Sequence, residues 1–382
     1  MSIPIDVAAL PPNAQKILDP NGPAPLKGMA AKGLVPGLKP GEILAVVVAL
    51  SLGADAHAET AKKTLEQLPM PLVNGALGGE LQPGVLDVLG PLFVKDAALS
   101  EKILRHPSIQ PETVAAMAQH ATEGVAELIA TNEERMLAFP QIIEHLYLNR
   151  HTRMSTADRI LELAVRNGLE LTGIPAFAQA KKAIEGELIS EPTDEPTFDD
   201  QQFADAKRIA ESVRIDGEED THRLNEETGQ EEVVDKAKPL HAIWSDLRAP
   251  SKIRLLMLGN LDGERVDIKA LRMIGVRDAN PLVAVAALNA PGLGDSEVVK
   301  IAGLRNVAED VLREIATSKE WTRHYMVKFN LVANPRTPFG QAAKWIMHLR
   351  ENDLKSLAKS KEVPGAVQTA AKQQLQRKGK QG

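Results

Sequence analysis

Apolar side chains recur along the chain at helical spacing, in short segments separated by turn residues. One segment follows Ser155, with apolar residues at positions i, i+3, i+4 and i+7 of one helix face: Ala157, Ile160, Leu161 and Ala164. Ser155 is placed to cap this helix, and Asn167-Gly168 is a stop signal. The same spacing recurs at Ala342, Trp345, Ile346 and Leu349. No comparable alternation of period two has the length of a strand, so the pattern predicts an all-α fold.

Short units of one kind recur, each with a turn, a proline or small polar residue, and then an apolar helix. Four of them begin at Leu81-Gln82-Pro83, Ile109-Gln110-Pro111, Leu293-Gly294-Asp295 and Val363-Pro364-Gly365, and the first two lie 28 residues apart. Proline suits the first position of a helix because its missing N–H costs no hydrogen bond there. The recurrence predicts helical repeats, which bury their apolar faces by stacking on their neighbours.

A longer period relates the two halves of the chain. Three segments have counterparts in the same order: residues 106–109 with 290–293, 129–134 with 315–320, and 146–152 with 331–337. The offsets are 184, 186 and 185 residues. Because order and spacing are both kept, we expect two α-solenoid arrays that are related by internal duplication.

Composition supports helices over sheets and excludes several kinds of chemistry. Aromatic residues make up only 3% of the chain, whereas Ala and Leu are abundant. The chain has no cysteine, which rules out disulfides, thiolate catalysis and cysteine-ligated zinc. The N-terminus lacks the features of a signal peptide, and the most apolar run, residues 43–52, is too short to cross a bilayer. We therefore expect a cytoplasmic protein without membrane insertion.

Charge is distributed unevenly and indicates the boundaries of the domains. Residues 185–235 hold 18 acidic and 4 basic residues, a net charge of −14, so the rest of the chain carries +8. We expect a helical repeat array at 1–183, an acidic and largely disordered linker at 184–238, a second array at 239–374, and a basic tail at 375–382. The linker is interpreted either as a tether or as a segment that folds on a partner. The tail either contacts an anionic partner or only aids solubility.

The repeats resemble known helical families. Paired helices such as 41–52 and 57–68 are similar to HEAT-type repeats, and the proline-led units are similar to the leucine-rich variant repeat. The whole chain also resembles an uncharacterised family of bacterial helical-repeat proteins. The residues that carry this resemblance are 29–36, 277–284, and Trp321 through the segment 334–338. The resemblance implies a HEAT-like architecture and no particular activity.

No motif in the sequence indicates an active site, a cofactor site or a metal site. The glycine-rich segment 75–80 lacks the Gly-Lys-Ser/Thr ending of a phosphate loop. The nine histidines are dispersed, and none of their spacings matches a zincin helix. The chain contains no Gly-x-Ser-x-Gly elbow and no carboxylate pair suited to acid–base catalysis. We expect no catalytic residues, no cofactor and no metal.

Candidate partner-binding residues gather around the motif Asn334-Pro335-Arg336-Thr337-Pro338. Four nearby basic side chains are candidates for an anion-binding patch: Arg323, His324, Lys328 and Arg336. The alternative interpretation is structural, with a turn at Asn334-Pro335, a cap at Thr337 and Pro338 at the first helical position. Trp244, Trp321 and Trp345 are expected in the core, with Trp321 the candidate for an exposed contact because Arg135 stands at the matching position.

The leading hypothesis is a non-enzymatic protein-binding scaffold of the bacterial cytoplasm. Duplication, repeats and the absence of a catalytic motif favour it. A nucleic-acid-binding helical array that uses the +8 body is the first alternative, and it predicts a contiguous basic stripe. An enzyme with a site in a concave groove is the second, and it predicts a deep polar pocket.

Overall fold

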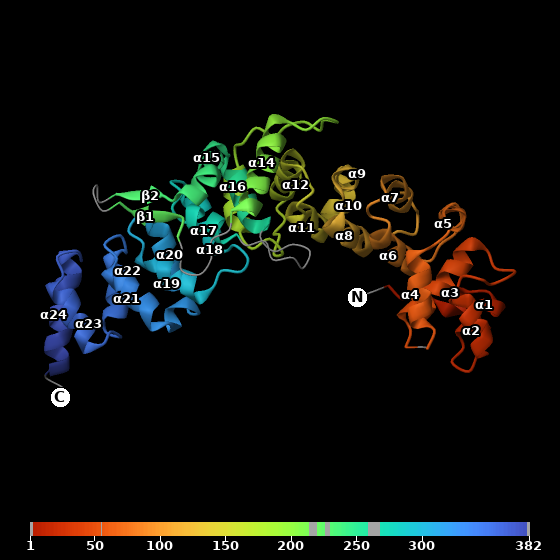
Figure 1. The fold of residues 1–382 in the computed structure, drawn as a ribbon, viewed down its shortest axis with the longest axis horizontal. Helices are drawn as coiled ribbons and strands as arrows, with labels where there is room; N and C mark the ends of the chain where they lie inside the picture. The colour runs from red at the N-terminus through yellow and green to blue at the C-terminus, as the bar shows by residue number, and fades with distance from the viewer. Residues whose placement is uncertain (1–2, 55, 214–219, 226–229, 259–267, 380–382) are drawn as a thin grey trace. The chain divides into compact units, whose positions relative to one another are not determined.

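The computed structural model describes residues 3–54, 56–213, 220–225, 230–258 and 268–379 (Figure 1). About 65% of the chain is helical. The strands among the described residues are β1 (His222–Leu224) and β2 (Glu231–Val233), which form one antiparallel hairpin. The all-α prediction is confirmed. The chain divides into two compact units, unit 1 (Met1–Leu169) and unit 2 (Glu170–Gly382).

Unit 1 contains a short 3₁₀ helix and a series of α-helices joined by tight turns. They are η1 (Val7–Ala9), α1 (Pro12–Leu18), α2 (Ala24–Ala30), α3 (Pro40–Leu52), α4 (Ala58–Glu66), α5 (Met70–Leu77), α6 (Pro83–Leu92), α7 (Ala97–Leu104), α8 (Pro111–His120), α9 (Glu123–Ala130), α10 (Glu133–Ala138), α11 (Gln141–Leu148) and α12 (Met154–Arg166). Non-adjacent helices pack on one another, since α8 contacts both α6 and α11. Their shared core is fully buried and includes Val114, Met117, Ile142, Ile143 and Leu146.

The helix starts of unit 1 follow the proline-led units. Helices α6 and α8 begin at Pro83 and Pro111, where the absent N–H leaves no bond unmade. Helix α12 differs from its prediction, because it begins at Met154 and places Ser155 inside the helix rather than at the cap. Its end is as predicted, with Gly168 at φ +68°, a conformation that glycine adopts without steric cost.

Unit 2 holds the remaining helices and the hairpin. Its helices are α13 (Phe177–Ile184), α14 (Phe198–Ser212), η2 (Asp235–Ala237), α15 (Lys238–Asp246), α16 (Ala249–Met257), α17 (Lys269–Gly275), α18 (Pro281–Leu288), α19 (Asp295–Gly303), α20 (Glu309–Thr317), η4 (Trp321–Arg323), α21 (Tyr325–Ala333), α22 (Phe339–Ile346), α23 (Glu351–Lys359) and α24 (Gly365–Gly379). Alternate helices again pack together, in the order α16, α18, α20, α22 and α24. In the part of the chain described, none of the helices has both the length and the apolar character to cross a bilayer.

The boundary between the units differs from the predicted one at 183/184. It falls after Leu169, because α13 packs against α16 and α18 of unit 2. The side chains of α13 that are buried include Phe177, Ala180 and Ile184. The predicted basic tail also differs, since α24 continues to Gly379, and residues 380–382 lie outside the described part of the chain.

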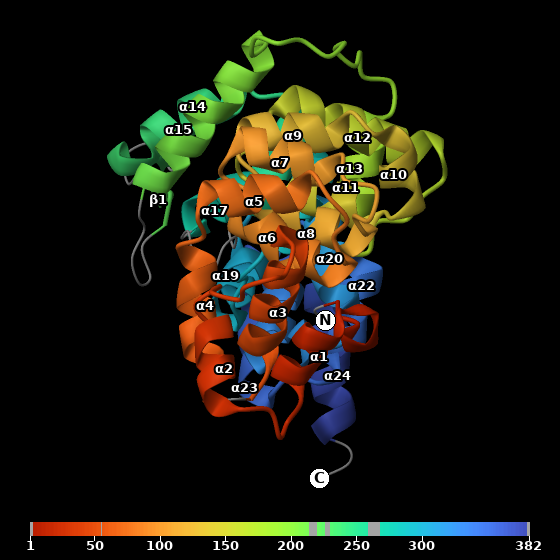
Figure 2. The ribbon, with the colours of Figure 1, turned by 90° about the vertical axis from the view of Figure 1, so that its right-hand side faces the viewer.

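The acidic segment 184–238 is not a largely disordered linker in its described residues. Thr197 and Asp200 form a capping box at the start of α14, which lies along α15 and also contacts α16 (Figures 1 and 2). Phe203 is buried on this helix, and the Arg254 guanidinium lies 4.9 Å from its ring centre. A few apolar positions at helical spacing therefore order a segment whose average composition is that of a solvated chain. Residues 214–219 and 226–229 lie outside the described residues.

Candidate functional site

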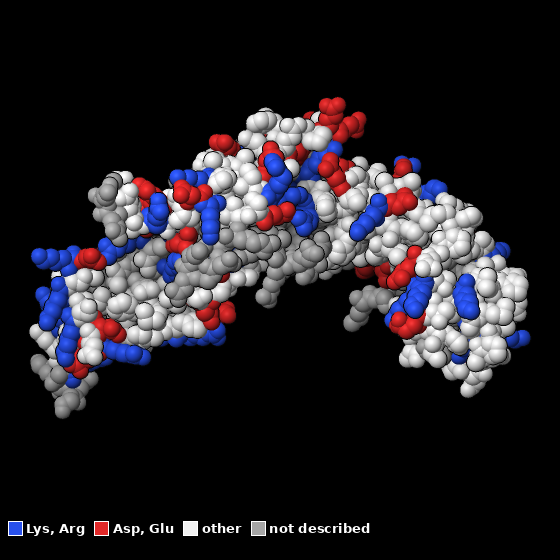
Figure 3. Space-filling model, in the orientation of Figure 1, with Lys and Arg blue, Asp and Glu red and all other residues white. Residues whose placement is uncertain are grey.

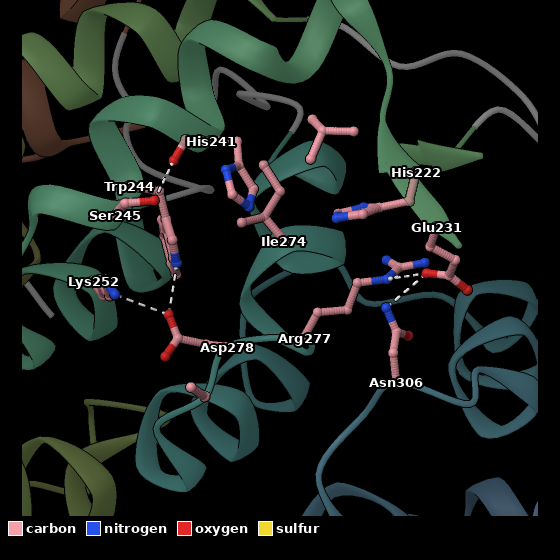
Figure 4. Close-up of a pocket in the computed structure, with 12 residues that line it drawn as sticks. His222, Glu231, His241, Trp244, Ser245, Lys252, Ile274, Arg277, Asp278 and Asn306 are labelled. Carbon is pink, nitrogen blue, oxygen red and sulfur yellow. Dashed lines mark hydrogen bonds and ion pairs between the residues drawn. The ribbon is translucent and has the colours of Figure 1, made fainter. Parts of the chain in front are cut away.

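A cavity of about 540 Å³ in unit 2 has mostly polar walls (Figure 4). The hairpin forms one wall, and α15, α16, the α17–α18 junction and the loop after α19 form the others. The lining residues are His222, Glu231, Val233, His241, Trp244, Ser245, Lys252, Ile274, Arg277, Asp278, Ala279 and Asn306. Its volume lies within the range of small-molecule sites, about 300–1,000 Å³.

One end of the cavity is built around the Asp278 carboxylate. Its Oδ2 accepts hydrogen bonds from Trp244 Nε1 (2.7 Å) and from Lys252 Nζ (3.0 Å). The Lys252 ammonium also lies 5.6 Å from the centre of the Trp244 ring, within cation–π range. Since Asp278 and Trp244 are buried, these contacts satisfy polar groups that would otherwise be costly to bury.

The other end is built around Arg277, whose guanidinium is buried between two carboxylates of the acidic segment. Arg277 Nη2 donates to Asp220 Oδ2 (3.1 Å), and its Nε lies 3.6 Å from Glu231 Oε2. Lys300 lies 3.3 Å from Asp220, and Asn306 Nδ2 donates to Glu231 Oε2 (2.7 Å). Burial raises the pKa of Asp220, but attraction to Arg277 and Lys300 outweighs it, so the pKa lies below its usual value. Ion pairs therefore hold the hairpin on unit 2.

Two histidines face each other across the centre of the cavity. The rings of His222 and His241 meet edge-on with their centroids 6.1 Å apart, and Thr221 Oγ1 lies 2.8 Å from His222 Nδ1. Burial, and then the nearby Arg277 charge, lowers the pKa of His222 from 6.5 to about 4. His222 is consequently a neutral imidazole at pH 7.

The pKa of His222 predicts a pH dependence of stability. Between pH 6.5 and about 4 the unfolded chain binds a proton at this residue and the folded chain does not, so the free energy of unfolding falls as the pH falls through this window. Above pH 6.5 the effect is absent. His222→Gln should flatten the dependence measured by urea unfolding followed through tryptophan fluorescence. All three tryptophans lie in unit 2, so His57→Gln in unit 1 is the matched control. An unchanged slope in His222→Gln contradicts this expectation.

The charged groups of the cavity are engaged with one another rather than arranged for chemistry. Lys252 is paired with Asp278, and Arg277 with Asp220 and Glu231. Within the described residues, His, Asp and Glu side chains form no group of three that is placed to hold a metal ion. A general acid or base needs a titratable group poised near the working pH, and His222 lies far from it.

The predicted partner-binding residues are distributed over three places in unit 2. Arg323 and His324 share a hydrogen bond and both approach Asp295 on α19, with His324 Nε2 3.0 Å from its Oδ2. Lys328 lies over the ring of Trp345, 5.5 Å from its centre. Arg336 reaches the Val307 carbonyl (3.4 Å) at another junction. Within the described residues no hydrogen bond or ion pair joins the three places, and Asp295 opposes the positive charge of the first.

The motif Asn334–Pro338 has a structural role that the alternative interpretation anticipated only in part. Asn334 is buried and its Nδ2 donates to the carbonyls of Ala302 (2.9 Å) and Leu304 (2.7 Å), at the C-terminal end of α19. These carbonyls lack helical partners, so the asparagine caps a helix about 30 residues earlier. Helix α22 begins at Phe339, one residue later than predicted, with Pro338 at its N-cap.

The tryptophans differ in burial. Trp244 is in the core, whereas Trp321 and Trp345 are half-buried. Trp321 lies in η4 beside Arg323. The core prediction therefore holds for Trp244 alone.

Sequence reasoning missed the cavity, although one signal for it was present. The segment 277–284, which carries part of the family resemblance, supplies Arg277, Asp278 and Ala279 to the wall. The hairpin residues were hidden in the acidic composition. No protein family, curated protein or solved structure matches this chain.

Proposed function

We propose that the chain is a non-enzymatic protein-binding scaffold built from stacked HEAT-like helical repeats. The observation that carries the proposal is a series of side-chain clamps between helices about 30 residues apart. In unit 1, His145 Nδ1 donates to the Ala115 carbonyl and Asn149 Nδ2 to those of Ala118 and Ala121. Stacked repeats bury their faces in this way and leave a long exposed surface for partners.

The clamps also support the proposed duplication. Asn149 and Asn334 are 185 residues apart, and each caps the C-terminal carbonyls of an earlier helix, at Ala118 in unit 1 and at Ala302 in unit 2. Each then accepts a hydrogen bond from a backbone N–H two residues later. One turn before the asparagine, His145 in unit 1 and Asn330 in unit 2 repeat the donation to an earlier helix. The correspondence in hydrogen bonding is independent of the sequence match that predicted it.

Binding is favoured over catalysis because the polar groups of the cavity neutralise one another. Buried charge pairs of this kind are common in structural networks, and perturbed pKa values alone do not make an active site. The enzyme alternative would need a reactive group in the cavity that is not held by a neighbour.

The nucleic-acid alternative rests on the C-terminal helices. On the face drawn in Figure 3, Lys and Arg side chains gather over this end of unit 2, while acidic and basic residues are interspersed elsewhere. Several of the basic groups are already engaged, since Lys355 pairs with Glu351 and Lys378 donates to the Leu349 carbonyl. Nucleic acid is therefore an outcome to be tested rather than our proposal.

Affinity capture from a native, nuclease-treated lysate of the source cells tests the proposal. The intact chain, immobilised, should retain a protein in stoichiometric amount, and nuclease treatment should not reduce the yield. An unrelated helical protein of similar charge on the same matrix is the control. Repeated captures without a stoichiometric protein contradict the proposal. Retention that nuclease abolishes and that falls steeply with salt favours the nucleic-acid alternative.

A further inference from the structure

A second cavity, of about 410 Å³, lies in unit 1 between the ends of α7 and α9 and the start of α10. Its walls combine apolar side chains, among them Leu104, Ile109 and Leu128, with polar ones. Arg135, on α10, is the half-buried cation of this cavity.

The guanidinium of Arg135 is uncompensated. Its Nη2 donates to the Leu104 carbonyl (3.3 Å), and within the described residues no carboxylate lies within ion-pair distance of it. Burial lowers the pKa of Arg135, and no acidic side chain offsets this. By contrast, the buried guanidiniums of Arg272 and Arg277 each contact a carboxylate. Desolvating a cation without a partner is unfavourable, so the site is poised for an anion.

The neighbouring polar groups of the cavity are already occupied. Arg105 is paired with Glu101 (2.8 Å). His106 Nε2 lies 3.1 Å from the Gly79 carbonyl, and its Nδ1 accepts from the Ser108 N–H (3.2 Å). This pattern requires the neutral Nε2–H tautomer, so His106 adds no charge. The cavity therefore offers one positive charge.

We propose that the Arg135 cavity binds a side-chain carboxylate of the partner, next to an apolar side chain of the same peptide segment. A planar guanidinium matches a carboxylate through two parallel hydrogen bonds, and the apolar wall accommodates the adjacent residue. A phosphate carries up to two negative charges and would be matched by more than one cation, which favours a carboxylate. This inference rests on the proposed protein-binding function and specifies the chemistry of the partner.

Binding of two capped pentapeptides to the full chain tests the inference. One is Ala-Leu-Glu-Leu-Ala, and its twin has Gln in place of Glu. Measured by ligand-observed NMR titration, the Glu peptide should bind about tenfold more tightly, as expected for a charge-assisted hydrogen-bonded pair. Arg135→Gln should reduce the Glu peptide to the level of its twin. Arg105→Gln, which removes an exposed and already paired guanidinium, should leave the difference intact.

Three results would overturn the inference: equal binding of the two peptides to the unaltered chain, a difference that survives Arg135→Gln, or displacement of the Glu peptide by inorganic phosphate more readily than by acetate. The first comparison needs no variant, so it stands even where Arg135→Gln disturbs folding, which circular dichroism will show. Failure here and failure of the proposed function are distinguishable. A captured partner that Arg135→Gln retains fully removes this site but leaves the scaffold proposal in place.

Discussion

Replacing Arg272 by methionine should lower the free energy of unfolding of unit 2 by about 3–5 kcal/mol, the usual cost of breaking a buried ion pair. Arg272 is 5% exposed and joins α17 to α19 through Glu297, with Nη2–Oε2 and Nη2–Oε1 distances of 2.8 and 3.0 Å. Its Nη1 also donates to the Pro291 carbonyl (2.9 Å). Methionine fills similar space but leaves the Glu297 carboxylate buried without its cation. Urea unfolding followed by tryptophan fluorescence measures the loss.

Two variants test the cause of that loss. Arg313→Met removes an arginine from an exposed pair with Glu309 on α20 and should cost less than about 1 kcal/mol. The double variant Arg272→Met/Glu297→Leu removes both buried charges and should recover most of the stability, because no unpaired charge remains. A loss in Arg272→Met no larger than that in Arg313→Met would contradict the assigned role of this pair.

Asn149→Ala and Asn334→Ala should each destabilise their own unit by about 2–4 kcal/mol, since each leaves two buried carbonyls without a donor. Asn149 is 3% exposed and Asn334 is 4% exposed. Because the tryptophans all lie in unit 2, Asn334→Ala should shift the fluorescence transition. Asn149→Ala should shift the transition seen by circular dichroism and leave the fluorescence transition in place.

The exposed Asn74 provides the matched control for both asparagines. Its Nδ2 donates within α5 to the Met70 carbonyl, so Asn74→Ala should cost no more than about 0.5 kcal/mol. A large effect at one clamp and none at the other would count against their equivalence, and with it against the proposed duplication.

Helical periodicity and proline chemistry were sufficient to predict the fold class and many helix starts. The start of α8 at Pro111 and the end of α12 at Gly168 follow from local backbone chemistry that short-range sequence contains. The start of α12 was displaced by one residue, because the helix continues back to Met154, whose side chain is buried.

The boundary and the acidic segment could not be predicted, because both depend on tertiary contacts. Helix α13 belongs to unit 2 through packing on α16 and α18, which no local pattern records. In the acidic segment, the average charge concealed Phe203 and two carboxylates that pair with Arg277. Composition predicts solvation only when the charges find no partner elsewhere in the chain.

The candidate sites show the same limit. The basic residues Arg323, His324, Lys328 and Arg336 are close in sequence, yet Asp295, Trp345 and the Val307 carbonyl engage them at separate places. The unmatched cation is instead Arg135, singled out in the sequence only as the counterpart of Trp321. What distinguishes it is the absence of a carboxylate among its described neighbours, and a sequence without structure does not contain that information.

Hydrogen exchange followed by mass spectrometry on Asn149→Ala and Asn334→Ala tests the repeat architecture most directly. In a stacked array each repeat is stabilised by its nearest neighbours, so the effect of a broken clamp should be local. Exchange should rise in α8 to α12 for Asn149→Ala and in α19 to α22 for Asn334→Ala, with α1 to α3 and α24 respectively unchanged in the variant of the other unit. A uniform rise along the whole chain in either variant would contradict the account.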